Sequence, residues 1–172
     1  MTPRELDILL KLSRKRYEPT DEQIASFMVD SNAIEGEHGL HPNDVEAARQ
    51  FLSAPMTAAS LLECHRLLAE HLQVDWAGRY RTCDVRVGDY RAPHFDLVPS
   101  LMAKFWRTLP KLDTFTAHNT FQKIHPFRDL NGRTGRLIWL HKALGEGYSF
   151  RISFLHAFYY DTLQHQKSDL KP

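Results

Sequence analysis

Residues 125–136 read His-Pro-Phe-Arg-Asp-Leu-Asn-Gly-Arg-Thr-Gly-Arg and bring several chemically useful side chains close together in the chain. His125 is the side chain of this stretch whose ordinary pKa suits it to accept a proton near neutral pH. Asp129 is a single carboxylate, and one carboxylate together with phosphate oxygens commonly holds Mg²⁺. Arg133 and Arg136 stand three residues apart, so on a helix they share one face and can both bind phosphate oxygens. The stretch therefore predicts a site that handles the phosphates of a nucleotide.

The backbone around this stretch predicts an anion site at the start of a helix. Pro126 disfavours helical geometry at the residue before it, so a helix should end at His125. A second helix should begin beside Asn131 and Gly132. The first N–H groups of a helix have no intrahelical partner and lie at the positive end of the helix dipole, which favours a bound phosphate. Phe127 has no chemistry to offer and should anchor the loop in the core.

The order of these residues resembles the signature of the Fic family, which reads His-x-Phe-x-Asp/Glu-Gly-Asn-Gly-Arg-x-x-Arg. The chain matches every specified position except one, Leu130, where the family usually has glycine. The resemblance implies a protein adenylyltransferase that transfers AMP from ATP to a Ser, Thr or Tyr hydroxyl of a target protein. It implies that His125 deprotonates the hydroxyl and that Asp129 holds Mg²⁺. It further implies that the α- and β-phosphates are bound by Asn131, Gly132 and Arg133. Arg136 would bind the γ-phosphate.

Leu130 keeps two alternatives open. If this position requires a positive φ, leucine costs on the order of 1 kcal/mol or more there. Its side chain could also crowd the phosphates. The alternatives are that the same site transfers phosphate or another phosphate-linked group to a protein, and that the chain is a nucleotide-binding scaffold without catalysis.

A second motif, Ser31-Asn32-Ala33-Ile34-Glu35-Gly36, stands near the N-terminus. Gly36 suits a helix C-cap, but a glutamate in the last turn opposes the helix dipole, which prefers cations there. The motif resembles the inhibitory Ser-x-x-x-Glu-Gly of Fic proteins in its N-terminal arrangement. The resemblance implies that Ser31, Glu35 and Gly36 are inhibitory, with Glu35 paired to Arg136 so that the ATP γ-phosphate loses its partner.

The elements that must position these residues are mostly helical. Apolar spacing and capping residues predict helices that open at Thr2 and at Thr20, the second ending near residue 36, and further helices over about 42–52, 56–72, 98–109, 114–124, 132–145 and 153–164. The exception is residues 80–93, where Val85 and Val87 alternate with charged neighbours and Gly88 and Asp89 can form a tight turn, which predicts a short β-hairpin.

The hairpin segment resembles the Fic flap, to which an extended target segment adds as a strand. The candidate flap residues are Val85, Arg86, Val87 and Gly88. Tyr159 and Tyr160 resemble residues of the family's last core helix and are candidates for the pocket of the nucleotide base. We therefore predict an all-α, single-domain Fido/Fic fold over residues 1–172, with an inhibitory helix at 20–36, a β-hairpin flap at 80–93 and the motif loop at 125–136.

Composition excludes several other classes. Apolar residues make up 42% of the chain and charged residues 25%, and the net charge is +1, so no charge bias points to nucleic acid or membrane. Lys123, Arg128 and the two motif arginines could suit a nucleic-acid-binding helix-turn-helix, but the near-neutral charge and Asp129 argue against it. No apolar run approaches the roughly 18 residues of a membrane span. The expected partners are ATP, Mg²⁺, a protein carrying a hydroxyl and possible further copies of the chain.

Cysteine and histidine spacing indicates neither a disulfide scaffold nor a transition-metal site. Cys64 and Cys83 lie 19 residues apart without a CxxC pattern, which fits a reducing, cytoplasmic location. His118 and His125 are two helical turns apart, but no third ligand falls at a suitable spacing.

Overall fold

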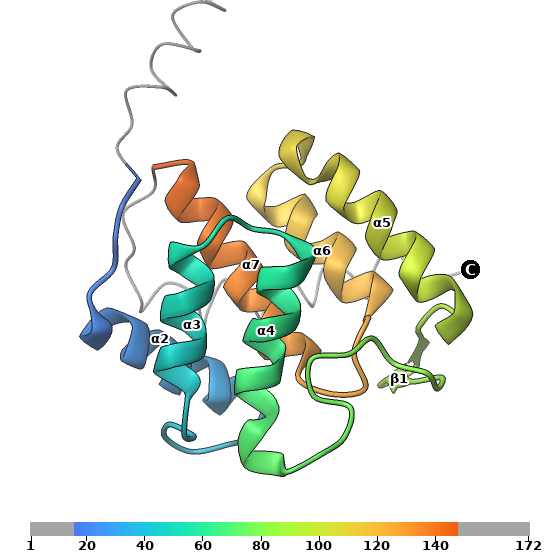
Figure 1. Cartoon of the computed structure of the whole chain (residues 1–172), viewed down its shortest axis with the longest axis horizontal. Coiled ribbons are helices and arrows are strands. Elements are labelled where there is room, and N and C mark those ends of the chain that lie inside the picture. Colours follow the sequence, from blue (N-terminus) through green and yellow to red (C-terminus); the bar gives the residue numbers. More distant parts are fainter. Residues whose placement is uncertain (1–15, 148–172) are drawn as a thin grey trace, which may run out of the picture.

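The computed structural model describes residues 16–147, and this part of the chain is mostly helical, with one small hairpin (Figure 1). The α-helices are α2 (Asp21–Ile34), α3 (Asp44–Ser53), α4 (Ala58–Ala69), α5 (Val98–Thr108), α6 (Thr114–Ile124) and α7 (Asn131–Gly145). Short 3₁₀ turns cover Glu70–Leu72, Phe95–Leu97 and Leu109–Lys111. The predicted all-α fold with a hairpin is confirmed. The helix expected to open at Thr2 and the one over 153–164, with Tyr159 and Tyr160, lie outside the described residues.

Local capping chemistry sets both ends of α2. Thr20 accepts a hydrogen bond from the N–H of Gln23, and the Gln23 side chain accepts one from the N–H of Thr20, which completes the predicted cap as a capping box. At the other end Gly36 has φ +80°, and the N–H of Glu37 reaches back to the carbonyl of Asn32. This Schellman arrangement stops the helix where the sequence predicted and leaves Glu35 as the C-cap residue.

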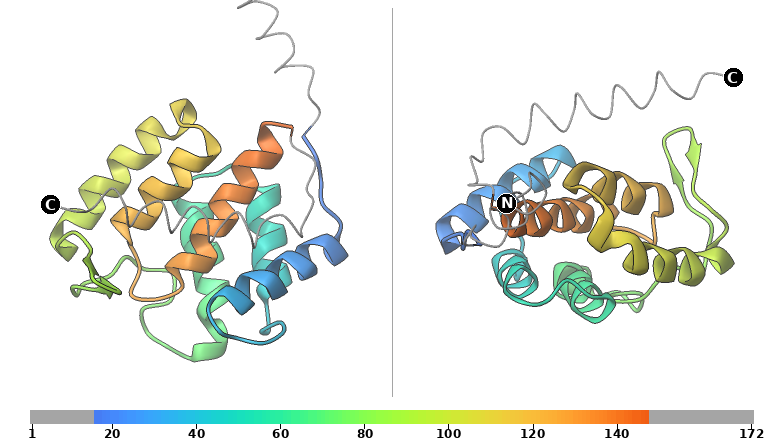
Figure 2. Two further views of the ribbon diagram at one scale, coloured as in Figure 1. Left: turned by 180° about the vertical axis from the view of Figure 1, so that it is seen from behind. Right: turned by 90° about the horizontal axis from the view of Figure 1, so that it is seen from above.

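Helix α7 is the centre of the fold. It packs against α6, α3, α2 and α4, and the views from behind and from above show it surrounded by these helices (Figure 2). Leu137, Ile138 and Leu140 of α7 are buried, and the core around them includes Phe27, Phe51, Phe105, Phe121 and Phe127. Because α7 begins directly after the motif loop, the core fixes the helix start at which the anion site was predicted.

The hairpin is shorter than the predicted segment. Strands β1 (Arg86–Val87) and β2 (Tyr90–Arg91) pair antiparallel, and Gly88 between them has φ +58°. Val85 precedes β1 and extends the pairing, since its carbonyl accepts a hydrogen bond from the N–H of Ala92. All four strand residues are exposed, and the hairpin projects from the helical body beside the start of α5 (Figure 2). No helix among residues 16–147 has the length and apolar character needed to cross a membrane.

Candidate active site

His125 caps the C-terminus of α6 and is held as a neutral base. Its backbone takes the left-handed conformation, φ 50° and ψ 61°, while its N–H still bonds the carbonyl of Phe121 at 2.9 Å. Nδ1 lies 3.3 Å from the carbonyl oxygen of Gln122, so the ring donates from Nδ1 and leaves Nε2 as the acceptor. Burial lowers the pKa of His125, and the Arg81 charge lowers it further, against the raising effects of the Gln122 carbonyl, Glu35 and Asp129.

The loop from Phe127 to Asn131 is closed by a side-chain amide. The Asn131 Nδ2 donates to the carbonyl of Phe127 at 2.9 Å, and its Oδ1 accepts from the N–H of the same residue at 2.9 Å. Asn131 was predicted to bind phosphate. Its side-chain amide instead bonds the main chain of Phe127. The group of Asn131 that we still predict to bind phosphate is therefore its main-chain N–H.

Leu130 has φ +62°, the left-handed conformation in which a glycine would be unstrained. Its side chain is buried at 3% exposure within the hydrophobic core. It is also the N-cap residue of α7 and makes no side-chain cap, so the first N–H groups of the helix are left for another acceptor. The predicted strain is therefore present, while the core holds the leucine side chain that was expected to crowd the phosphates.

Arg133 has a buried donor without a partner. The residue is 6% exposed, and its Nε has no hydrogen-bond partner among the described residues. Burying a charged group without a partner is costly, so such a donor at a helix N-terminus indicates a place for an anion. A Cβ at the neighbouring Gly132 would overlap Oε1 of Glu35, so a side chain there would displace this carboxylate.

The structure brings Arg136 together with the predicted inhibitory residues. Its guanidinium is fully buried, and Nε donates to Oγ of Ser31 at 2.7 Å. Nη2 donates to the carbonyl of Ser31 at 2.8 Å and to Oε1 of Glu35 at 2.8 Å. The Glu35 side chain is 39% exposed and lies over Gly132, at the mouth of the α7 N-terminus. A carboxylate therefore lies where the α7 dipole and Arg136 favour an anion.

Asp129 lies exposed on the loop before α7. Its Oδ1 accepts the N–H of Leu130 at 2.6 Å, and its carbonyl lies 3.2 Å from Nε2 of His65. Within residues 16–147 no three His, Cys, Asp or Glu side chains lie close enough together to hold a metal ion, and His118 and His125 form no such group. A role of Asp129 in binding Mg²⁺ would therefore depend on oxygens supplied by the nucleotide, and it stays a prediction.

Sequence reasoning assigned no role to two buried neighbours of the motif, His65 and Arg81, which contact the carbonyl groups of Asp129 and His125. His65 of α4 is fully buried and stacks on Phe127 with ring centroids 3.8 Å apart. Its Nδ1 accepts the N–H of Gly78 at 2.9 Å, so Nε2 carries the proton and donates to the carbonyl of Asp129. Burial lowers the pKa of His65 to about 4, which keeps the ring neutral. On the sequence it is one histidine on an apolar helix face, and nothing marks its partners.

Comparison with known proteins identifies the family. A model described as the Fic/DOC family matches residues 55–141, half of the chain. The chain belongs to the Fic/DOC family. Two curated relatives, both named protein adenylyltransferase Fic, are from Culex quinquefasciatus and Aedes aegypti, 29% and 28% identical over 87% of the chain. The chain spans only about a third of their length, 34% in each case.

Solved Fic structures share the fold of this Fic/DOC protein. A Fic family protein from Desulfovibrio desulfuricans G20 superposes with a TM-score of 0.62 at 23% identity, covering 98% of this chain and 68% of that one. Fic-1 from C. elegans gives a TM-score of 0.59 at 19% identity, covering 95% of this chain and 66% of that one. The predicted Fido/Fic fold is thereby confirmed for this member of the family.

The hairpin of this Fic/DOC protein, the predicted flap, is attached near the end of α6. The Tyr90 hydroxyl donates to the carbonyl of Lys123 near the end of α6 at 3.0 Å. Val87 and Tyr90 are exposed at 44% and 38%, although both carry large apolar groups. The predicted flap residues Val85, Val87 and their neighbours therefore lie on a ribbon that is open to solvent and close to the histidine.

Proposed function

We propose that this Fic/DOC protein is a protein adenylyltransferase, which transfers AMP from ATP to a hydroxyl of a target protein. The observation that carries the proposal is the pairing of a base with an anion site. His125, with Nε2 as its acceptor, directly precedes the loop that opens into α7 at Asn131. Arg133 adds a buried donor without a described partner at that helix start. The names of the two insect relatives support the same activity.

In the proposed reaction Nε2 of His125 takes the proton of the target hydroxyl. The hydroxyl oxygen then forms a bond to the α-phosphorus of ATP, and the bond from that phosphorus to the pyrophosphate oxygen breaks. Because Nδ1 donates to the Gln122 carbonyl, the imidazole keeps its orientation as it gains the proton. The lowered pKa of His125 ensures that the ring is neutral before the reaction at physiological pH.

The residues that would hold the nucleotide lie at the start of α7. The main-chain N–H groups of Asn131 and Gly132 and the Arg133 guanidinium suit the α- and β-phosphates, since all are donors at a helix N-terminus. Asp129 fits a magnesium ion, because it is an exposed carboxylate beside this anion site. Such an ion would neutralise charge on the phosphates. Arg136 would bind the γ-phosphate once Glu35 has left it.

Leu130 gives no reason to prefer the alternatives over AMP transfer. The sequence left open whether a leucine in this loop changes the backbone conformation or fills the space that the phosphates need. It keeps a positive φ, and its side chain lies in the core. The loop therefore has the backbone that a glycine would give it, and the departure from the signature supplies no argument for transfer of a different group.

We further propose that Glu35 restrains the enzyme. Its carboxylate bonds Arg136 and lies over Gly132, so it competes with a phosphate for both. Arg136 is buried and its charge needs an anionic partner, so a nucleotide can displace Glu35 only at an energetic cost. The restraint requires that Ser31 hold Arg136 from the other side, as its hydroxyl and carbonyl do.

The test uses wild type, Glu35→Gly and Glu35→Gly/His125→Ala with Mg²⁺ and ATP labelled at the α- or γ-phosphate. Protein labelling is read on the enzyme itself and on a cell lysate. Glu37→Gln is the matched control, because this glutamate pairs with His41 instead of an arginine of the motif. We expect α-label to rise in Glu35→Gly, to disappear with His125→Ala and to be unchanged in the control.

The two labels separate the competing activities. γ-Label on protein in place of α-label would replace AMP transfer by phosphate transfer. Failure of both labels with folded variants that bind ATP in a direct titration would leave a nucleotide-binding scaffold and refute the proposed activity. Equal α-labelling by wild type and Glu35→Gly would refute the restraint and leave the activity standing.

A further inference from the structure

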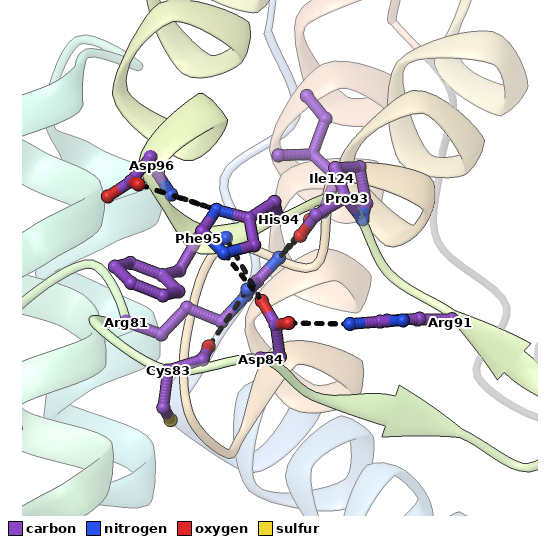
Figure 3. Close-up of polar contacts among 9 residues, drawn as sticks. All are labelled: Arg81, Cys83, Asp84, Arg91, Pro93, His94, Phe95, Asp96 and Ile124. Carbon is purple, nitrogen blue, oxygen red and sulfur yellow. Dashed lines mark hydrogen bonds and ion pairs between the residues drawn. The ribbon is translucent and has the colours of Figure 1, made fainter.

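Arg81 is a buried charge whose recorded side-chain hydrogen bonds all go to main-chain carbonyl groups. The residue is 3% exposed. Its Nη1 donates to the carbonyl of Cys83 at 2.9 Å, and Nη2 donates to that of Pro93 at 2.5 Å and to that of Ile124 at 3.5 Å (Figure 3). Nε donates to the carbonyl of His125 at 2.8 Å. A planar guanidinium can serve several acceptors in fixed directions, which a lysine ammonium on its flexible stem cannot.

These carbonyl groups belong to two parts of the site. Cys83 and Pro93 stand on either side of the hairpin, before β1 and after β2. Ile124 and His125 form the end of α6. The main chain of Arg81 adds a further link, since its N–H donates to the carbonyl of Pro126 at 2.9 Å. One side chain thus joins both ends of the flap to the residue proposed as the base.

At His125 the bond from Arg81 meets a local need of the backbone. The last carbonyl groups of a helix lack intrahelical partners, and His125 is moreover held at φ 50°, a left-handed conformation that is strained for a residue with a Cβ. The donor at 2.8 Å satisfies this carbonyl and fixes the peptide plane that follows the histidine. Together with the bond from the His125 N–H to the carbonyl of Phe121, this contact holds the main chain on both sides of the Cα from which the imidazole leaves.

At the flap the same side chain adds to the attachment to α6 that the hairpin makes itself, from the Tyr90 hydroxyl to the carbonyl of Lys123. Each strand has two residues, all of them exposed, and a two-stranded hairpin alone is marginal in water. Asp84 braces the same ribbon from outside, through Arg91 at 2.9 Å and the N–H of Phe95 at 3.3 Å (Figure 3). Those contacts stay within the flap segment and its exit, whereas the contacts of Arg81 reach α6.

We propose that Arg81 is a positioning residue for group transfer, which fixes the flap and the His125 imidazole in one frame so that a target hydroxyl held by the flap meets Nε2. The inference rests on the proposed function, since it assumes that His125 is the base. It goes beyond that function because Arg81 contacts neither the nucleotide site nor the solvent face of the flap. A displacement of about 1 Å between base and hydroxyl would cost on the order of a hundredfold in rate.

The test compares Arg81→Lys and Arg81→Met in the Glu35→Gly background. Arg79→Met is the matched control, because Arg79 is an exposed arginine on the same segment. Each variant is assayed for its rate of self-labelling from α-labelled ATP, for ATP affinity by calorimetry and for its melting temperature. The pKa of the His125 imidazole is followed by NMR of histidine-labelled protein, a measurement that needs no turnover.

We expect both Arg81 variants to lose on the order of tenfold to a hundredfold in transfer rate, with ATP affinity unchanged and the control unaffected. The pKa of His125 should separate the two, because Arg81 and Asp129 are the charged groups that still act on this ring once Glu35 is replaced. Arg81→Met removes a cation and should raise that pKa. Arg81→Lys keeps the cation and should leave it near the parent value, although the fork of hydrogen bonds is lost.

Several results would overturn the proposal: an unchanged transfer rate in the folded variants, a joint fall of ATP affinity and rate, or loss of folding in both, which would make Arg81 a purely structural residue. If the Glu35→Gly parent with Arg81 intact transfers no label, the proposed function fails by itself. The NMR titration then still decides about Arg81, because an unchanged pKa of His125 in Arg81→Met would refute its link to the imidazole.

Discussion

Leu130 offers a test in which backbone strain and side-chain burial act in opposite directions. Its φ of +62° favours glycine, which occupies this position in the family signature, while its side chain is 3% exposed in the core. Relief of the left-handed conformation is worth about 1 kcal/mol. Deletion of a buried leucine side chain costs about 2–5 kcal/mol. Burial is the larger effect, so we expect Leu130→Gly to destabilise the protein despite restoring the signature.

The strain itself is isolated by comparing two deletions of the same side chain. Leu130→Ala, like Leu130→Gly, removes the buried side chain beyond Cβ, but it keeps the Cβ at positive φ. We therefore expect the glycine variant to be the more stable of the two by about 1 kcal/mol, or roughly 2–4 °C in melting temperature. Leu137 is the matched control, because it is fully buried in the middle of α7. There glycine should be less stable than alanine by about 1 kcal/mol, the opposite sign.

The assay is urea unfolding followed by circular dichroism, with thermal melting as a second measurement. Equal stability of the alanine and glycine variants at Leu130, or a more stable alanine variant, would contradict the left-handed conformation of this residue. A Leu130→Gly variant more stable than wild type would contradict the burial of its side chain. In either case the argument that Leu130 leaves the loop unchanged for AMP transfer would fail.

Three further predictions concern charge and burial. Arg133→Met should leave the free energy of unfolding unchanged or raise it, because the buried Nε has no partner among the described residues. Its ATP affinity, measured by calorimetry, should fall about tenfold or more. A marked loss of stability would contradict this prediction. In Glu35→Gly the pKa of His125, already lowered by burial, should fall further, because a carboxylate that stabilises the imidazolium is removed, and an NMR titration showing a rise would refute it. A thiol reagent should modify the exposed Cys83 in the native protein and the buried Cys64, whose pKa burial raises, only on unfolding.

The helix boundaries around residues 125–136 could be predicted from the sequence because they depend on neighbouring residues. Pro126 ends α6 at Ile124, with His125 as its cap, and Asn131 opens α7 as predicted. The capping box at Thr20 and the positive φ of Gly36 bound the helix that carries Glu35. These features depend on a few neighbouring residues, and near neighbours are all that local patterns describe.

Side-chain partners within the motif were less predictable. Asn131 is a polar residue at an expected anion site, but both ends of its amide bond the main chain of Phe127. Leu130 was a departure whose consequence depended on its φ, and its burial in the core had no local signal. An amide or an apolar side chain in a loop can face a ligand or the core, and packing decides between them.

What the sequence by itself determined is the family and the helical fold, because motif residues, caps and spacing encode these directly. It also predicted which residues would transfer a nucleotide. The tertiary structure alone decided which groups meet. Arg136 meets Ser31 across 105 residues of chain, and His65 and Arg81 bond the carbonyl groups of Asp129 and His125. Every residue carries a carbonyl group, so a bond to one leaves no trace in residue identity and is set only when distant segments pack together.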